Sequence, residues 1–361
     1  MKIAFRADAS IQIGTGHVMR CLTLATELQQ RGHNCRFICR EHPGHLSDFI
    51  ADKGFAVDLL PAPASDTDTS DLSWNTHAPW LGVLWQEDAE QTESLLKEQP
   101  VDWLIVDHYA LDTNWEQQLS AVTSKIMVID DLADRDHLCH LLLDQTYGRR
   151  KEDYKTRVPE HCQVLCGSQF ALLRPEFAHW REYSLKRRQQ PELKQLLVNM
   201  GGVDKDNVTG QVLDALRESE LPLDCRIVVV MGATAPWLEQ VRQQAETLRW
   251  HIEIRVGVSN MAQLMAYSDL AIGAAGATSW ERCCLGLPSI MIVLAENQKK
   301  IAFKLAESQT ALIMQSTFKN SDLTNLIYTA QINQRTLVQN TQAVCDGQGV
   351  MRVAEQLDKT K

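Results

Sequence analysis

The chain has 361 residues, of which 44% are hydrophobic, and a formal net charge of −10 at pH 7. At about 150 residues per domain, this length predicts two domains, and the ordinary apolar content excludes a disordered chain. The acidic charge argues against nucleic acid and anionic membranes as partners. It leaves room for a local basic pocket that binds one phosphorylated small molecule.

The sequence has no segment typical of export or of membrane insertion. Arg6 and Asp8 interrupt the apolar N-terminal stretch, and no stretch approaches the ~18 uncharged apolar residues of a membrane span. Ten scattered cysteines without a Cys-x-x-Cys motif predict buried free thiols and no structural zinc. We therefore expect a cytoplasmic protein.

The first half of the chain alternates short apolar runs with a helical pattern. Residues 2–6, 35–39, 103–107 and 125–130 have the composition of buried strands. Between the first two, residues 17–30 have apolar side chains at helical spacing, and Gly32 is a plausible end signal. Strand, helix and strand in this order favour a parallel sheet.

A second cycle begins near Leu196. Strands are expected at 196–200, 226–231, 252–256, 270–272 and 289–294, with helices at 208–217, 237–248, 261–267 and 279–285. The charged segment 176–194 is interpreted as a linker between an N-terminal domain, 1–175, and a C-terminal domain, 195–361. The predicted class is α/β, with two doubly wound, Rossmann-like domains whose strand ends could face each other across a cleft.

The loop after the first strand carries the first candidate site. Gly14 and Gly16 allow a ligand to approach the backbone, but Met19 stands where a dinucleotide fingerprint requires its third glycine. His17 opens the next helix, whose positive end disfavours imidazolium, so a neutral general base is one interpretation. The other is a histidine that only satisfies the loop backbone. For Arg20, a surface ion pair is favoured over a phosphate contact.

The second candidate site lies at residues 269–281. A strand leads into a turn of small residues and then a helix that opens with Thr278 and Ser279, an arrangement suited to a diphosphate. Glu281, one turn later, can accept hydrogen bonds from both hydroxyls of a ribose. Alternatively, Thr278 or Ser279 is only an N-cap and Glu281 only complements the helix dipole. Gly201 and Gly202 form a third small-residue turn, which could also approach anionic oxygen.

Ordered motifs between residues 5 and 298 resemble the UDP-sugar hydrolase family of pseudaminic acid biosynthesis. The motifs are 5–10, 13–22, 106–109 (Val-Asp-His-Tyr), 129–133, 170–177, 200–204, 279–288 and 295–298. The resemblance implies a GT-B fold, without a cofactor or metal. It also implies inverting hydrolysis of UDP-2,4-diacetamido-2,4,6-trideoxy-β-L-altropyranose by water, which releases UDP and the free sugar.

The same resemblance implies roles for individual residues. The catalytic residues would be His17, as the base, with Tyr109 and Asn297. Substrate contacts would come from Arg6, Ser10, Gly14, Gly16 and Arg174. UDP would be bound by Met200, Gly201, Gly202, Asn260, Met261, Ala277, Thr278, Ser279 and Glu281. Chemically, UDP is a well-stabilised leaving group, and a base on the opposite face of the sugar gives inversion.

Three alternatives remain open from the sequence. A GT-B glycosyltransferase would share the nucleotide site but use another acceptor. A nucleotide-sugar sensor would keep the site without catalysis. A metal-dependent hydrolase could use the acid-rich stretch with Asp130, Asp131, Asp134, Asp136, His137 and His140.

Overall fold

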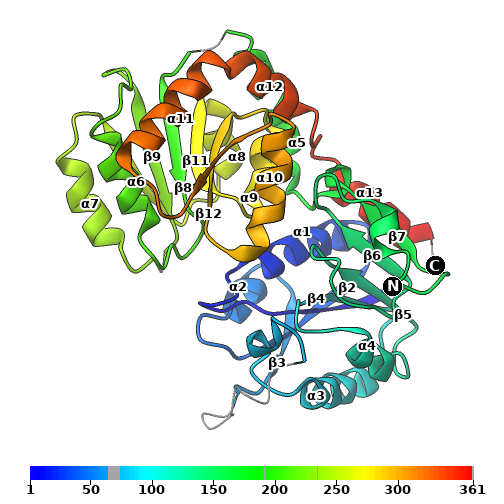
Figure 1. Cartoon of the computed structure of the whole chain (residues 1–361). Coiled ribbons are helices and arrows are strands. Elements are labelled where there is room, and N and C mark those ends of the chain that lie inside the picture. Colours follow the sequence, from blue (N-terminus) through cyan, green and yellow to red (C-terminus); the bar gives the residue numbers. More distant parts are fainter. Residues whose placement is uncertain (64–73, 191, 234, 360–361) are drawn as a thin grey trace. The chain divides into compact units, whose positions relative to one another are not determined.

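The computed structural model describes residues 1–63, 74–190, 192–233 and 235–359, apart from the side chain of Asn297. The chain divides into two compact units, Met1–Leu172 with Gly349–Lys361, and Leu173–Gln348. Each unit consists of a parallel sheet with helices on its faces (Figure 1). The prediction of two α/β, Rossmann-like domains is confirmed.

Unit 1 is built on a seven-stranded sheet of order β3-β2-β1-β4-β5-β6-β7. Every neighbouring pair is parallel. The strands are β1 (Lys2–Ala7), β2 (Asn34–Arg40), β3 (Ala56–Leu60), β4 (Trp103–Asp107), β5 (Lys125–Ile129), β6 (Leu141–Asp144) and β7 (Gln163–Cys166). The helices are α1 (Gly16–Gln30), α2 (Ser47–Asp52), α3 (Trp85–Glu98), α4 (Thr113–Leu119) and α13 (Gly349–Lys359), with short 3-10 turns η2 (Ala78–Trp80), η3 (Lys151–Tyr154) and η4 (Ser168–Phe170).

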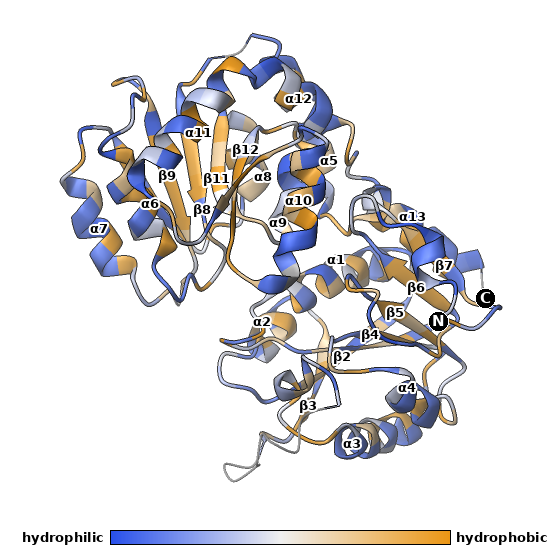
Figure 2. Ribbon diagram, viewed as in Figure 1, coloured by the Kyte–Doolittle hydropathy of each residue, from blue (hydrophilic) through white to orange (hydrophobic). Residues whose placement is uncertain are grey.

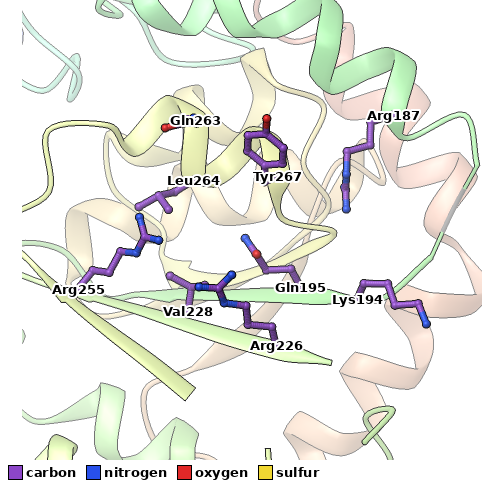
Figure 3. A pocket seen from close by; sticks show the side chains of 9 residues that line it. All are labelled: Arg187, Lys194, Gln195, Arg226, Val228, Arg255, Gln263, Leu264 and Tyr267. Carbon is purple, nitrogen blue, oxygen red and sulfur yellow. The ribbon is translucent and has the colours of Figure 1, made fainter. Parts of the chain in front are cut away.

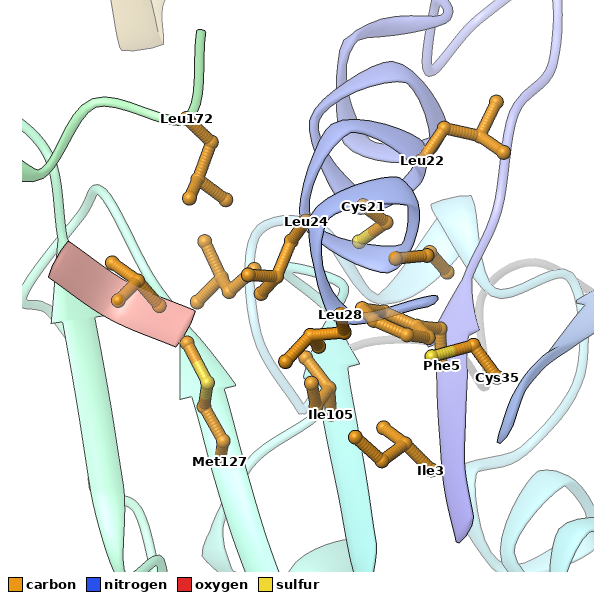
Figure 4. Packing of buried hydrophobic residues seen from close by; sticks show 14 of the residues in the cluster. Ile3, Phe5, Cys21, Leu22, Leu24, Leu28, Cys35, Ile105, Met127 and Leu172 are labelled. Carbon is orange, nitrogen blue, oxygen red and sulfur yellow. The ribbon is translucent and has the colours of Figure 1, made fainter. Parts of the chain in front are cut away.

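Both faces of this sheet are buried, as is usual for parallel sheets. On one face, Phe5 stacks on Phe37 at 5.0 Å, and the core there includes Val353 and Leu357 of α13. Figure 4 shows Leu24 and Leu28 of α1 in the same core. On the other face, strand residues pack against α3 and α4. Burying each such large apolar side chain stabilises the fold by about 1.5–3 kcal/mol. Gly32, with φ of +84°, ends the α1 segment, as the sequence predicts.

Unit 2 repeats the same topology. Its six-stranded parallel sheet has the order β10-β9-β8-β11-β12-β13. The strands are β8 (Gln195–Asn199), β9 (Arg226–Met231), β10 (Ile252–Val256), β11 (Leu270–Ala274), β12 (Ser289–Val293) and β13 (Leu312–Gln315). The helices are α5 (Pro175–Arg187), α6 (Val208–Leu216), α7 (Leu238–Glu246), α8 (Met261–Tyr267), α9 (Thr278–Cys284), α10 (Lys299–Glu307), α11 (Asn320–Ile332) and α12 (Gln334–Gln342), with the 3-10 turn η5 (Glu296–Gln298).

The sheet of unit 2 has one strongly apolar face. Alternate residues of β8, β9, β11 and β12 form a core with α6, α7, α11 and α12. In Figure 2 the central strands are apolar, whereas the helices turn a polar side outward. The opposite face is covered by α8, which contacts β8, and by α9, which contacts β11, while α5 packs on these two helices.

The unit boundaries differ from the predicted ones at two places. Residues 176–187 of the expected linker belong to α5 of unit 2, where Arg181 donates to the carbonyl oxygens of Cys284, Gln342 and Cys345. The C-terminal helix α13 belongs to unit 1, because its apolar side completes the core around α1. The charge-rich composition of this segment therefore does not indicate a linker, because its arginines donate hydrogen bonds to carbonyl groups at the ends of other segments.

Two further sequence expectations can be compared with the structure. All ten cysteines are free, and nine of them are buried. Among the described residues, none of the helices has the length and apolarity needed to cross a bilayer.

Candidate functional site

Each sheet reverses its strand order at one point, where ligands of doubly wound folds bind beyond the carboxyl ends of the strands. In unit 1 this point lies between β1 and β4, and in unit 2 between β8 and β11. The loop with Gly14, Gly16 and His17 follows β1, and Tyr109 follows β4. Gly201 and Gly202 follow β8, and the turn before α9 follows β11.

The loop after β1 is held by its own backbone. The Gly14 N–H donates to the Ser10 carbonyl at 2.8 Å, and Gly14 has a φ of +80°, which favours glycine. The Ser10 hydroxyl accepts from the N–H groups of Gln12 and Ile13 at 3.2 and 2.9 Å. Beside Gly16, the space that a Cβ would occupy is open. Ser10 therefore shapes the loop, while Gly16 leaves backbone accessible.

His17 lies in the first turn of α1 and contacts a buried carboxylate. Its Nδ1 lies 2.6 Å from Oδ1 of Asp107, the last residue of β4, which is fully buried. Burial raises the pKa of Asp107, but the Arg20 guanidinium and the His17 imidazole outweigh it and hold that pKa well below its ordinary value. The ionised carboxylate accepts a hydrogen bond from Nδ1–H, so Nε2 carries the lone pair of the neutral ring. This imidazole can accept a proton from water.

Arg20 holds the same carboxylate from the next turn of α1. Its Nε and Nη2 donate to Asp107 at 2.6 Å each, and its Nη1 donates to Asp131. Arg20 is buried, so the favoured prediction of a surface ion pair is wrong. The Tyr109 hydroxyl donates to the same Asp131 oxygen at 2.9 Å, and its ring meets His17 edge-on at 4.6 Å. Two predicted catalytic residues, His17 and Tyr109, are thus brought together by two aspartates and an arginine.

An aromatic wall stands beside His17. It consists of Tyr109, Trp80 and His77, with ring centroids 4.7–5.8 Å apart. Trp74 fixes this segment, because its indole N–H donates to the Ala110 carbonyl at 2.9 Å. Burial lowers the pKa of His77, so that ring is neutral near pH 7. Trp80 and His77 could not be predicted as site residues from the sequence, since an aromatic residue in a loop belongs to no periodic pattern.

Arg6 does not occupy the position expected of a substrate contact. It is fully buried in β1, where its guanidinium donates to Asp8 at 2.6 Å and to Asp88 at 2.6 and 3.2 Å. Arg40 donates to the same Asp88 carboxylate at 2.7 Å. These charges are paired with one another inside the unit, so Arg6 supports the end of β1 from within.

Side chains of the acid-rich stretch after β5 form hydrogen bonds and ion pairs with other residues of the unit. His137 pairs with Glu116 at 2.7 Å, and Asp130 accepts from Tyr154 at 2.7 Å. Asp131 binds Arg20 and Tyr109, as described above, and Asp134 pairs with Arg135. Within the described part of the chain, no three His, Cys, Asp or Glu side chains form a group suited to a metal ion.

In unit 2, the turn after β8 exposes backbone rather than side chains. Gly201 has a φ of +96°, and the position of its missing Cβ is open. Met200 is buried, so it can offer a ligand only its backbone. Asp204 closes the turn, because its carboxylate accepts from the N–H groups of Val208 and Thr209 at 2.9 Å each.

The turn after β11 is fixed by Arg282. This buried residue donates to the Ala274 carbonyl at 2.8 Å, to the Thr278 hydroxyl at 3.2 Å and to the Ser279 hydroxyl at 3.2 Å. Ser279 is fully buried, so the prediction that its side chain faces a phosphate is wrong. Ala277, which is exposed, is the N-cap of α9, so neither Thr278 nor Ser279 has that role.

Glu281 and Arg174 form the charged part of this site. Burial raises the pKa of Glu281 to about 7, against the opposing influence of Arg174 and Arg282. Arg174 also pairs with Glu176 at 3.0 Å.

Asn260 is exposed before α8, where its amide donates to Gln263 at 2.9 Å, and Met261 begins that helix. Both follow the edge strand β10, whereas Glu281 follows the central strand β11. The side chain of Asn297 lies outside the described residues.

If Glu281 binds the ribose of UDP, as the sequence resemblance implies, its raised pKa predicts pH-dependent binding of UDP. Only the carboxylate form accepts hydrogen bonds from both ribose hydroxyls, and a pKa of about 7 makes its population fall about tenfold from pH 8 to pH 6. We therefore expect UDP affinity to fall by about this factor over that range, beyond the effect of phosphate titration near pH ~6. Glu281→Gln should remove this component in calorimetric titrations, whereas Glu239→Gln, at an exposed position of α7, should retain it. Parallel profiles for wild type and Glu281→Gln would contradict the assignment.

The sequence is similar to one glycosyltransferase domain model and to two curated proteins. Residues 196–357 match the glycosyltransferase family 28 C-terminal domain. The chain is 28% identical over 308 residues to the UDP-2,4-diacetamido-2,4,6-trideoxy-beta-L-altropyranose hydrolase of Campylobacter jejuni, covering 85% of this chain and 97% of that protein. It is 24% identical to the spore coat polysaccharide biosynthesis protein SpsG of Bacillus subtilis, covering 98% and 96% of the two chains.

Solved structures share the fold. The Acinetobacter baumannii MurG structure matches with a TM-score of 0.71 at 16% identity and covers 99% of both chains. The structure of TcCGT1 in complex with UDP matches with a TM-score of 0.65 at 13% identity and covers 100% of this chain and 99% of that one. At these identities the likeness concerns fold alone: two Rossmann-like domains of the GT-B type.

Proposed function

We propose that this chain is an enzyme that hydrolyses a UDP-linked diacetamido-trideoxy sugar, UDP-2,4-diacetamido-2,4,6-trideoxy-β-L-altropyranose, with inversion, in pseudaminic acid biosynthesis. The observation that carries the proposal is the His17–Asp107 pair at the point where the first sheet reverses its strand order. The 28% identity to the Campylobacter jejuni hydrolase supports the choice of substrate.

In the proposed reaction, His17 deprotonates the water that attacks the anomeric carbon. Asp107 keeps the proton of the neutral ring on Nδ1 and stabilises the imidazolium that forms, while Arg20 holds Asp107 in place. The anomeric C–O bond to UDP breaks as the new C–O bond forms, which gives inversion. Tyr109 and Asn297 are proposed to position the sugar and the water.

UDP would be bound by unit 2. Backbone groups of Gly201, Gly202 and Ala277, with the Thr278 hydroxyl, would contact the diphosphate, and Arg174 would offset its charge. Glu281 would bind the ribose, and Asn260 and Met261 the uracil. A well-stabilised UDP leaves without a strong general acid, so this route requires no metal ion.

The test is UDP release with water as the only acceptor, followed by NMR of the product anomer across a panel of UDP-diacetamido sugars. The proposal expects turnover of the β-L-altro substrate and an inverted anomer as the first product. No UDP release until a second acceptor is added would overturn hydrolysis.

A glycosyltransferase is the second candidate. The match of residues 196–357 to a glycosyltransferase domain and the GT-B fold favour it. It would use the same UDP-sugar site with a hydroxyl acceptor in place of water. Acceptor-dependent turnover in the assay above would support this reading.

The aromatic wall predicts a specific kinetic effect. We expect Trp80 to pack against an apolar side of the sugar, because aromatic contacts of this kind contribute about 0.5–1.5 kcal/mol. Trp80→Ala should therefore raise KM about 2- to 10-fold and leave the Kd of free UDP unchanged. Trp180→Ala, at a partly buried position of α5 in unit 2, is the matched control. An unchanged KM in Trp80→Ala would show that the aromatic wall does not contact the sugar.

A further inference from the structure

Unit 2 contains a cationic pocket whose lining includes none of the residues assigned to UDP, although Gln263 in that lining accepts a hydrogen bond from Asn260 at 2.9 Å. It has a volume of about 390 Å³ and lies between the sheet and α8 (Figure 3). Its lining residues include four cations and no acidic side chain: Arg187, Lys194, Arg226 and Arg255. In a chain with a net charge of −10, such a concentration of positive charge is unexpected.

The pocket lies on the sheet face opposite the main apolar core of unit 2. Ile227 and Val229 of β9 contribute to that core, whereas the alternating residues Arg226 and Val228 line the pocket. Gln195 of β8 and Arg255 of β10 complete the floor, as Figure 3 shows. Gln195 and Arg226 begin their strands and Arg255 lies on the edge strand β10, so these polar side chains reach solvent where they line the pocket.

The two arginines on the floor share one carboxylate. Both Arg226 and Arg255 pair with Glu253, the latter through Nε at 2.7 Å. Arg187 pairs with Asp269 at 2.5 Å, and Lys194 with Asp224 at 2.6 Å. Four cations thus face three carboxylates, and one positive charge is left over at the Arg226–Arg255 pair.

The side of the pocket opposite the sheet, which we call its roof, consists of an aromatic ring and an apolar side chain. Leu264 and Tyr267 come from α8, and Tyr267 is 41% exposed. Its ring lies 5.2 Å from Tyr183 and 5.7 Å from Trp180, both on α5. Arginine donors opposite an aromatic roof suit an anionic group attached to an organic body.

We propose that this pocket binds a small phosphorylated molecule, with its phosphoryl group between Arg226 and Arg255 and its organic part under Tyr267. A guanidinium pair matches phosphoryl oxygens in geometry as well as charge. The volume is in the range of small-molecule sites. The pocket is a second ligand site, and it does not depend on the proposed UDP-sugar reaction.

The test is a calorimetric titration with pyrophosphate in the presence of saturating UDP, which occupies the proposed nucleotide site. We expect one bound pyrophosphate in wild type and at least tenfold weaker binding in Arg255→Gln and Arg226→Gln. Arg255→Lys should bind with intermediate affinity, because it keeps the charge and loses the planar donors. Arg217→Gln, an exposed arginine paired with Asp214 on α6, should bind as wild type does.

Three results would overturn the proposal: no pyrophosphate binding in wild type, binding that Arg255→Gln and Arg226→Gln leave unchanged, or equal weakening in Arg217→Gln. An unchanged Tm for each variant shows that the fold is intact. If UDP itself does not bind, the titration is run with pyrophosphate alone. Loss of pyrophosphate binding in Arg255→Gln would then still show that pyrophosphate binds in this pocket, while the proposal of UDP binding would fail separately.

Discussion

His17→Gln is expected to lower kcat for UDP release by about 10²–10⁴-fold, the usual contribution of a general base. Glutamine keeps a polar side chain of similar length at the start of α1, but it cannot accept a proton from water. The Kd for UDP should stay within about twofold, because the residues assigned to UDP are all in unit 2. Stopped UDP-release assays and calorimetric titration of UDP measure the two quantities.

The matched control is His161→Gln, an exposed histidine of the same unit. It should retain wild-type kcat and KM. A near wild-type rate in His17→Gln would show that His17 is not the base. A large loss of UDP affinity would instead indicate that the variant disturbs more than proton transfer.

The repeating α/β pattern could be predicted from the sequence because buried parallel strands are continuous apolar runs. Residues 103–107 and 196–200, for example, correspond to β4 and β8 within a residue. Four strands were not predicted. The edge strands β3, β7 and β13 are short and partly polar or exposed, and the buried strand β6 is only four residues long. The place of α13 was not predictable either, because its partner α1 is more than 300 residues away in the sequence.

The candidate site could also be predicted only in part from the sequence. Glycines and His17 form a local motif, so the loop after β1 could be identified without a structure. Asp107 could not, because it becomes relevant only when β4 pairs with β1 and places its carboxylate beside α1. The predictions that Ser279 and Arg6 contact a ligand were wrong for a related reason. The sequence gives the residue type but not the direction of the side chain, and both point into the interior.

Asp107→Asn should lower kcat by about 10²–10⁴-fold, because an amide no longer enforces Nδ1–H and a basic Nε2 on His17. The same change leaves the buried Arg20 with one carboxylate, Asp131, and we expect a loss of stability of about 3–5 kcal/mol. A rate measured on a partly unfolded sample would therefore mislead, so the fraction folded must be measured by circular dichroism at the assay temperature.

Asp131→Asn separates the two effects. It also removes a carboxylate from Arg20, but Asp131 contacts Arg20 and Tyr109 and makes no described contact with His17. When the rates are compared per folded molecule, kcat should therefore fall much further in Asp107→Asn, where the charged acceptor of the His17 Nδ1–H is lost, than in Asp131→Asn. If both variants lower kcat equally, Asp107 acts only through the stability of the buried network. If neither lowers it, Asp107 does not orient the imidazole of His17 for proton transfer.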